Sequence, residues 1–282
     1  MQERNSDMGI KNGYEDVNKG FIHIRDILAQ IYEQLQSSKN CGNEPCGIPT
    51  GFRSLDELIG GMRQGDLILI GARPGMGKTS FAANIAADAA INTKKAVCFF
   101  SLEEEAETIV TRMLSAEARI PYRKLRSRDI QSPFEWKSVA CACAGLSETD
   151  ILIDATPAIT VSTMKSQLRC VENLGLIVVD YLQLVKSDES ADDCLAHKSG
   201  GVLRELKVMA GELDVPVICC TQLSLPSEDQ SERRPVMTDL KNNCDAAELY
   251  ADIVLFLYKS QRYEESPLNN DFAKLFFAKN RG

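Results

Sequence analysis

A glycine-rich run between an apolar stretch and a helical pattern is the part of this chain that most clearly carries chemistry. Residues 70–80 read Ile-Gly-Ala-Arg-Pro-Gly-Met-Gly-Lys-Thr-Ser. A strand, a glycine loop and a helix in this order turn backbone N–H groups and the positive end of the helix toward phosphate. Lys78 can reach the β and γ oxygens of a triphosphate, and the Thr79 hydroxyl can ligate Mg²⁺. The sequence therefore predicts a nucleoside triphosphate site.

The predicted phosphate loop departs from the strict pattern at one place, where Ala72 stands instead of glycine. We interpret this small residue as a tolerated variant, because the strand and the helix on either side make a chance Gly-Lys-Thr the weaker alternative. The residues predicted to surround the nucleotide are Ala72, Arg73, Pro74, Gly75, Met76, Gly77, Lys78, Thr79 and Ser80.

Two carboxylates follow other strand-like runs and complete the predicted chemistry. Asp180 ends the apolar run Leu-Ile-Val-Val-Asp, and we expect it to hold Mg²⁺ through water. Its neighbour is Tyr181 rather than glutamate, so the residue that activates water must lie elsewhere. Glu103 follows the strand-like run 96–101 and is the predicted general base. Glu104 and Glu105 favour the other interpretation of that cluster, in which acidic side chains complement a helix N-terminus.

Gln222 follows a third strand-like run and precedes a long, charged loop over residues 223–236. An amide at this point can contact the γ-phosphate or the attacking water. Loss of the γ-phosphate would then be transmitted through the amide to the loop. The alternative is a solvated loop without a special role.

Apolar runs alternate with helical patterns along most of the chain, which predicts an α/β fold with a mostly parallel sheet covered by helices on both faces. The predicted strands are 67–71, 96–101, 151–154, 176–180, 215–221, 253–258 and 272–278. The predicted helices are 78–91, 105–119, 133–144, 161–173 and 195–213.

The N-terminal part has a different organisation. Residues 1–20 are polar, and we expect them to be frayed. Residues 21–46 combine a helix with a polar tether, ahead of the compact domain 47–282. The apolar stripe of that helix comprises Ile24, Ile27, Leu28, Ile31 and Leu35. The stripe can fold back on its own domain or dock on a neighbouring subunit, and the residues alone leave both possibilities open.

Composition limits the compartment and the partners. The 282 residues carry a formal net charge of −8, so nucleic acid contacts must come from a local patch. No apolar run is long enough to span a bilayer, and the N-terminus lacks a signal-peptide pattern, so we expect a cytoplasmic protein with no membrane partner. The ten cysteines and two histidines do not form a metal or disulfide pattern.

Several motifs together resemble the RecA-fold motor domain of DnaB-type replicative DNA helicases. The motifs are Thr50-Gly-Phe-Arg-Ser-Leu-Asp-Glu-Leu-Ile-Gly-Gly, the loop 72–79, Phe100-Ser-Leu-Glu, Val178-Val-Asp-Tyr-Leu-Gln-Leu, Val215-Pro-Val and Thr221-Gln-Leu. The resemblance covers about residue 47 to the end. It implies a RecA-like P-loop NTPase that uses ATP and Mg²⁺ to translocate on single-stranded DNA with 5′-to-3′ polarity.

The resemblance also implies assembly into a homo-oligomer, a hexameric ring, with primase and a helicase loader as partners. It assigns residues 21–48 to a linker helix that packs on the next subunit. It assigns Lys279 and Arg281 to the neighbouring subunit's nucleotide, and Lys241, Asn242 and Asn243 to DNA. The segment Asp239-Leu-Lys-Asn-Asn-Cys departs from the family's Asp-Leu-Arg-Glu-Ser-Gly, and the sequence stops before the family's next strand, as in a truncated domain.

Two alternatives to a helicase follow from these departures. One is a related RecA-fold ATPase that acts as a recombinase or timing switch, against which the Asp-Tyr-Leu-Gln-Leu and Ala-Lys-Asn-Arg motifs count. The other is a divergent relative that binds nucleotide and assembles, and that serves as a loader or partner platform without unwinding DNA. The altered segment 239–244 favours this second alternative.

Overall fold

The computed structural model describes residues 23–38, 47–187, 195–223, 233–241, 246–259 and 273–281. The chain divides into two units, Met1–Glu44 and Pro45–Gly282. The described part of the first unit is the helix α1 (Ile24–Ser38), so the predicted helix is confirmed. Ile24, Ile27, Leu28 and Ile31 on α1 are all exposed. The side chain of Leu35 lies outside the described part.

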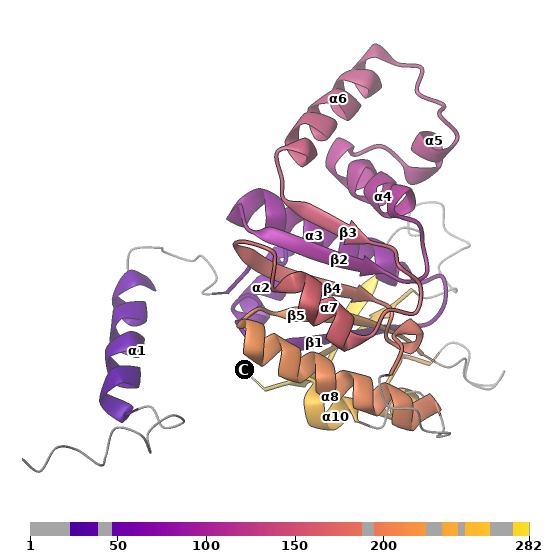
Figure 1. Ribbon diagram of the computed structural model, residues 1–282. Helices are drawn as coiled ribbons and strands as arrows, with labels where there is room; N and C mark the ends of the chain where they lie inside the picture. Colours follow the sequence, from indigo (N-terminus) through magenta and orange to yellow (C-terminus); the bar gives the residue numbers. More distant parts are fainter. Residues whose placement is uncertain are drawn as a thin grey trace, which may run out of the picture. The chain divides into compact units, whose positions relative to one another are not determined.

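The second unit is built on a seven-stranded sheet with the order β3-β2-β4-β5-β1-β6-β7. Its strands are β1 (Leu67–Ala72), β2 (Ala96–Ser101), β3 (Ile151–Asp154), β4 (Leu174–Asp180), β5 (Val217–Gln222), β6 (Ile253–Tyr258) and β7 (Lys274–Asn280). The first six strands run parallel, and β7 pairs antiparallel with β6. The predicted mostly parallel sheet is confirmed (Figure 1).

Helices connect the strands and lie on both faces of the sheet (Figure 1). They are α2 (Arg53–Ile59), α3 (Lys78–Thr93), α4 (Ala106–Ala118), α5 (Tyr122–Arg126), α6 (Pro133–Ser147), α7 (Val161–Leu168), α8 (Leu195–Leu213), α9 (Met237–Lys241) and α10 (Ala247–Tyr250). The predicted helix 161–173 is wrong at its end, because α7 stops at Leu168 and Asn173 adopts a positive φ of 52° just before β4. None of the helices in the described ranges is long and apolar enough to cross a bilayer.

Alternate residues of the central strands pack into two separate hydrophobic cores, one on each face of the sheet. Leu67 and Leu69 of β1 belong to the core beneath α7 and α8, whereas Ile68 and Ile70 belong to the core with α3 and α4. Every residue of β1 is buried. Apolar side chains on both faces of a strand are typical of a parallel sheet with two helical layers, and this explains the continuous apolar runs in the sequence.

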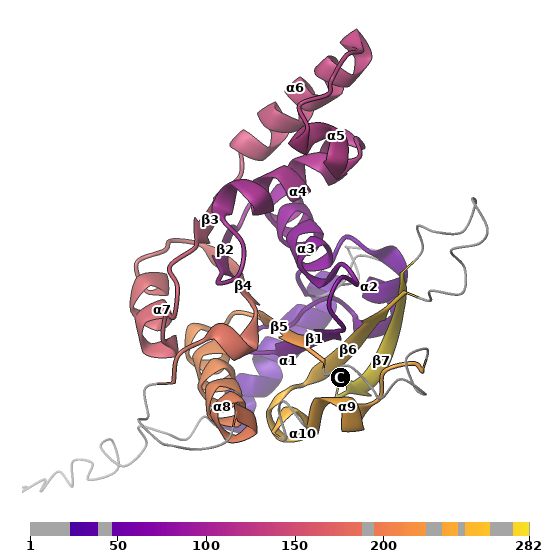
Figure 2. The same ribbon diagram turned by 90° about the vertical axis from the view of Figure 1, so that its right-hand side faces the viewer.

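Helices α5 and α6 lie beyond the β3 edge of the sheet, next to the end of α4. In both views α5 and α6 project away from the strands (Figures 1 and 2). With the end of α4 they share a small core of their own around Ala118, Ile120 and Ala142. Two large apolar side chains near the start of α6 are exposed, Phe134 by 82% and Trp136 by 58%.

The sheet topology separates the predicted site residues into two groups. The phosphate loop follows β1, Glu103 follows β2, Asp180 ends β4 and Gln222 ends β5, so all four lie at the carboxyl edge of the parallel strands. Because β7 runs antiparallel, its end lies at the opposite edge, where Asn280 pairs with Ile253.

Candidate nucleotide site

The backbone of the phosphate loop explains its glycines. Gly75 and Gly77 have φ values of 75° and 89°, and a Cβ at either position would meet nothing within 4 Å. Backbone conformation rather than space therefore requires glycine there. Ala72 is the buried last residue of β1 and is not among the residues with positive φ, so a methyl group is tolerated where the strict pattern has glycine.

The N-terminus of α3 is open for an anion. Gly77 precedes the helix, no side chain among the described residues caps it, and its first turn carries no acidic residue. The first N–H groups of a helix need partners from outside the helix, and phosphate oxygens supply them. Thr79 and Ser80 lie half-buried in this first turn, beside the loop.

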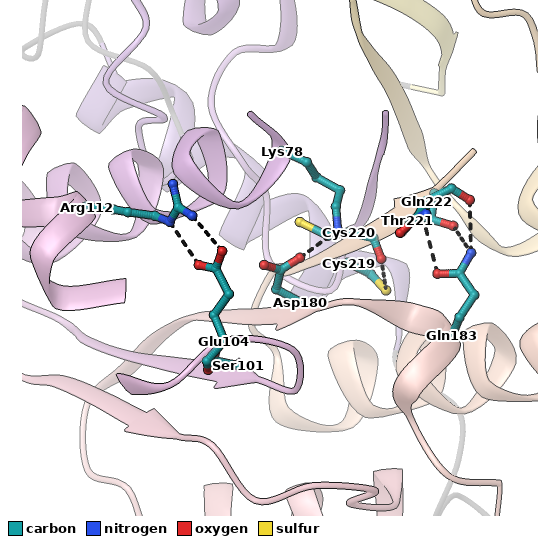
Figure 3. A network of polar contacts seen from close by, with 10 residues as sticks. All are labelled: Lys78, Ser101, Glu104, Arg112, Asp180, Gln183, Cys219, Cys220, Thr221 and Gln222. Carbon is teal, nitrogen blue, oxygen red and sulfur yellow. Dashed lines mark hydrogen bonds and ion pairs between the residues drawn. The ribbon is translucent and has the colours of Figure 1, made fainter. Parts of the chain in front are cut away.

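A buried ion pair joins the phosphate loop to the end of β4. The Lys78 ammonium lies 2.9 Å from an Asp180 carboxylate oxygen, with side chains 10% and 1% exposed (Figure 3). The ammonium also lies 4.4 Å from the centre of the Tyr181 ring. Burial lowers the pKa of Lys78, but the neighbouring acidic groups Cys220, Asp180 and Glu103 outweigh it, so the pKa is raised overall. Lys78 is therefore a positive charge at neutral pH.

Oxygen donors suited to Mg²⁺ lie in this pair and next to it in the chain. Mg²⁺ prefers oxygen ligands and keeps several waters, so one hydroxyl and one carboxylate beside a phosphate site are an adequate protein donor set. Thr79 offers the hydroxyl, one residue after Lys78, and Asp180 offers the carboxylate. The residues present fit the predicted metal.

The structure distinguishes the adjacent glutamates after β2. Glu104 is engaged by Arg112 of α4, whose Nε and Nη2 donate to the two carboxylate oxygens at 2.9 and 2.5 Å (Figure 3). Nη1 of Arg112 also donates to Ser80 Oγ at 3.0 Å. Glu103 is exposed, and its negative charge contributes to the raised pKa of Lys78. The arrangement leaves Glu103 facing solvent on the side of Lys78.

Gln222 is the last residue of β5, next to the start of the phosphate loop. It pairs in register with Ala72, and the N–H of Leu223 donates to the Ala72 carbonyl at 2.9 Å. The side chain of Gln183 approaches Gln222 from the β4 side, as Figure 3 shows. The predicted loop after Gln222 is described only at Leu223 and from residue 233 onward.

A chain of contacts leads from the phosphate loop toward α9. Arg73 is only 6% exposed, and its guanidinium donates to the Arg233 carbonyl at 2.8 Å. Arg233 in turn forms an ion pair with Asp239 of α9. Lys241 ends α9, but its side chain, and all of Asn242 and Asn243, lie outside the described part of the structure.

Lys279 and Arg281 lie far from the phosphate loop of their own chain. Leu275 pairs with Leu257, which pairs with Ala72, so Arg281 lies six residues farther along β7, about 20 Å away at the strand rise. The Lys279 ammonium donates to the carbonyls of Glu248 and Ala251 at 2.7 and 2.5 Å. The Arg281 guanidinium donates to the Leu249 carbonyl at 3.1 Å. Both cations thus rest on the carbonyl end of α10.

The sequence did not predict a role for two polar residues of the site, Gln183 and Arg112. Gln183 stands among apolar residues in Tyr-Leu-Gln-Leu, and a polar side chain in such a run was an available signal. Arg112 contacts Glu104 from the middle of α4, and nothing in its sequence context distinguishes it from a surface arginine.

Residues 47–282 match the family described as "DnaB-like helicase C terminal domain". The chain is 39% identical over 264 residues to the Replicative DNA helicase DnaB of Geobacillus stearothermophilus, covering 93% of this chain and 58% of that protein. It is equally similar to the Replicative DNA helicase DnaC of Bacillus subtilis (strain 168), with the same coverage. The chain thus spans a little over half the length of these relatives.

Solved structures agree. A structure described as an ATPase domain superposes with a TM-score of 0.81 at 29% identity, covering 92% of this chain and 91% of that one. A DnaB-like replicative helicase, from a structure describing its interactions with primase, superposes with a TM-score of 0.78 at 29% identity, covering 93% and 62%. The fold, the phosphate loop and these matches show that the chain belongs to the DnaB-like helicase C-terminal domain family.

Proposed function

We propose that this chain is the ATP-hydrolysing motor of a replicative DNA helicase, which translocates on single-stranded DNA and unwinds duplex. The observation that carries this proposal is the Lys78–Asp180 pair beneath a loop of positive-φ glycines. In the absence of nucleotide, a phosphate-binding lysine needs an anion, and a metal-binding aspartate needs a cation. The pair satisfies both, and triphosphate with Mg²⁺ can replace it without leaving a buried charge alone.

The residues around this pair have separate roles in ATP hydrolysis. The loop from Ala72 to Ser80 holds the phosphates through backbone N–H groups, and Lys78 contacts the β and γ oxygens. Thr79 and, through water, Asp180 would hold Mg²⁺, which when bound would neutralise the charge that develops on the phosphates. Glu103 orients and deprotonates the attacking water, because its neighbour Glu104 is already held by Arg112.

Gln222 is the proposed sensor of the γ-phosphate. Its register beside Ala72 places it at the mouth of the phosphate loop. The contacts from Arg73 through Arg233 to Asp239 join the same loop to α9, ahead of the proposed DNA contacts Lys241, Asn242 and Asn243. The chain has a net charge of −8, so DNA contact needs local positive charge, and Lys241 supplies it in this segment.

The nucleotide site is completed by a neighbouring chain in a homo-oligomeric ring, which we propose to be a hexamer. Lys279 and Arg281 lie at the wrong edge of the sheet for their own phosphate loop, and this placement suits contact with the next chain's nucleotide. The apolar stripe of α1 is exposed, and so are Phe134 and Trp136 near the start of α6. We propose that α1 of one chain docks on α6 of its neighbour.

Primase and a helicase loader are the proposed protein partners. The structural relative described with primase supports the first, and the family resemblance supports the second. We place the activity in the cytoplasm, where chromosomal or phage DNA replication takes place in bacteria.

The two glutamates after β2 give the first prediction. Glu103→Gln should retain ATP binding and reduce hydrolysis by about 10²- to 10⁴-fold, because a general base contributes a factor of this size. Glu104→Gln is the matched control, because an amide can still accept from Arg112, and it should hydrolyse ATP within about threefold of the parent. Steady-state phosphate release and nucleotide binding measure both effects. Parent-like hydrolysis by Glu103→Gln with loss in Glu104→Gln would reverse the assignment.

The second prediction concerns the binding of single-stranded DNA and the role of Lys241. Single-stranded DNA should stimulate ATP hydrolysis, and binding should weaken as salt rises. Lys241→Ala should weaken DNA binding at low salt and leave nucleotide affinity unchanged. The slope of log K for DNA binding against log salt concentration should fall in magnitude by about one. Fluorescence anisotropy over a salt series measures this, with Arg169→Ala at the exposed end of α7 as the control. Hydrolysis that single-stranded DNA leaves unchanged would instead support a partner platform that does not unwind DNA.

Sharing of the site between chains gives the third prediction. Lys78→Ala and Arg281→Ala should each be inactive alone, whereas mixed assemblies should recover part of the hydrolysis. Recovery is expected because some interfaces combine an intact Lys78 with an intact Arg281, and an arginine supplied by a partner contributes about 10³-fold or more in related reactions. Co-assembly is verified by differently tagged chains. Co-assembled mixtures that stay inactive would place Arg281 outside the neighbour's site.

A further inference from the structure

Gln183 bridges the ends of the two strands that carry Asp180 and Gln222. It lies in the short 3-10 helix η1 (Leu182–Leu184), three residues after Asp180. Its amide nitrogen donates to Thr221 Oγ1 at 2.9 Å and to the Gln222 carbonyl at 3.1 Å (Figure 3). Its amide oxygen accepts the Gln222 N–H at 3.3 Å. One side chain therefore binds both polar groups of the Gln222 backbone.

This contact begins where the sheet hydrogen bonding between β4 and β5 ends. The β4–β5 ladder pairs Val179 with Cys219 as its last position, three residues before Gln222. On its other side, Gln222 is still held by β1 through its register with Ala72. The Gln183 amide thus takes the place of the missing strand, and Gln222 is held from both sides, by the phosphate loop and by η1.

An amide suits the chemistry of the position. It is neutral and carries both a donor and an acceptor, so it can pair with a backbone carbonyl and a backbone N–H at once. Glutamate could accept but not donate, and it would add a negative charge near the buried Asp180. Leucine would keep the approximate volume but leave Thr221, which is fully buried, and the Gln222 backbone without this partner.

We propose that Gln183 is a positioning residue, which fixes the backbone of Gln222 relative to Asp180 so that the Gln222 amide meets the γ-phosphate at the correct distance. The inference rests on the proposed function, because it requires Gln222 to face a nucleotide. Gln183 itself contacts no substrate. It acts on hydrolysis through Gln222, and its removal should affect the rate of the chemical step rather than nucleotide affinity.

The test compares Gln183→Leu, Gln222→Ala and the double variant by DNA-stimulated ATP hydrolysis. Gln183→Leu should lower kcat about ten- to a hundredfold, since small misplacements of a reacting group have effects of this size, with KM and ADP affinity changed less than about twofold. In the Gln222→Ala background it should have almost no further effect on kcat. Gln167→Leu is the matched control, because Gln167 donates to Asp154 at 2.9 Å, away from the site, and its kcat should stay parent-like.

Equal losses of kcat in the two backgrounds, or a loss of ADP affinity, would overturn the proposal. Amide hydrogen exchange of the nucleotide-free variants gives a readout that does not need hydrolysis. The Gln222 N–H should exchange faster in Gln183→Leu while protection in β1 stays unchanged, and unchanged exchange at Gln222 would equally overturn the proposal. A parent protein that hydrolyses no ATP refutes the proposed function, whereas the exchange measurement still decides the role of Gln183.

Discussion

The buried pair between Lys78 and Asp180 is the interaction on which the rest of the site depends. Two charges with side chains 10% and 1% exposed are stable at the carboxyl edge of the sheet only because each compensates the other. The pair ties the phosphate loop after β1 to the end of β4, with β5 between them. Everything else at this edge is arranged around it, with Glu103 on one side and Gln222 on the other.

Tight packing of the central strands fixes the positions of these residues. β1, β4 and β5 are buried by helical layers on both faces, so their ends have little freedom. Hydrogen bonds from side chains then connect the segments that follow the strand ends. Arg112 joins the turn after β2 to the first turn of α3, and Gln183 extends the contact between β4 and β5 beyond their ladder. At the opposite edge, Lys279 and Arg281 are held by backbone carbonyls of Glu248, Leu249 and Ala251.

Local patterns in the sequence predicted most of the sheet and the phosphate loop, because the strands are continuous apolar runs and the loop needs glycine at positive φ. The end of α7 was missed since Leu168 to Asn173 still has helical composition, and the chain turns there only to begin β4. The preference for Glu103 over Glu104 could be argued from the sequence only by register and stays a prediction, which the contact of Arg112 with Glu104 supports. Gln183 and Arg112 act through pairings between distant segments, and a single sequence does not reveal these. Asn242 and Asn243 fall outside the described residues and stay predictions.

We propose that a triphosphate and Mg²⁺ replace the contact between Lys78 and Asp180. Calorimetric titration of a non-hydrolysable ATP analogue, with and without Mg²⁺, tests it in the parent and in Asp180→Asn, with thermal unfolding to verify that the variant is folded. The parent should bind the analogue more tightly when Mg²⁺ is present. Asp180→Asn should lose that gain while binding the Mg²⁺-free analogue at least as tightly as the parent, because Lys78 is released from its carboxylate. The same Mg²⁺-dependent gain in both proteins would show that Asp180 does not hold the metal.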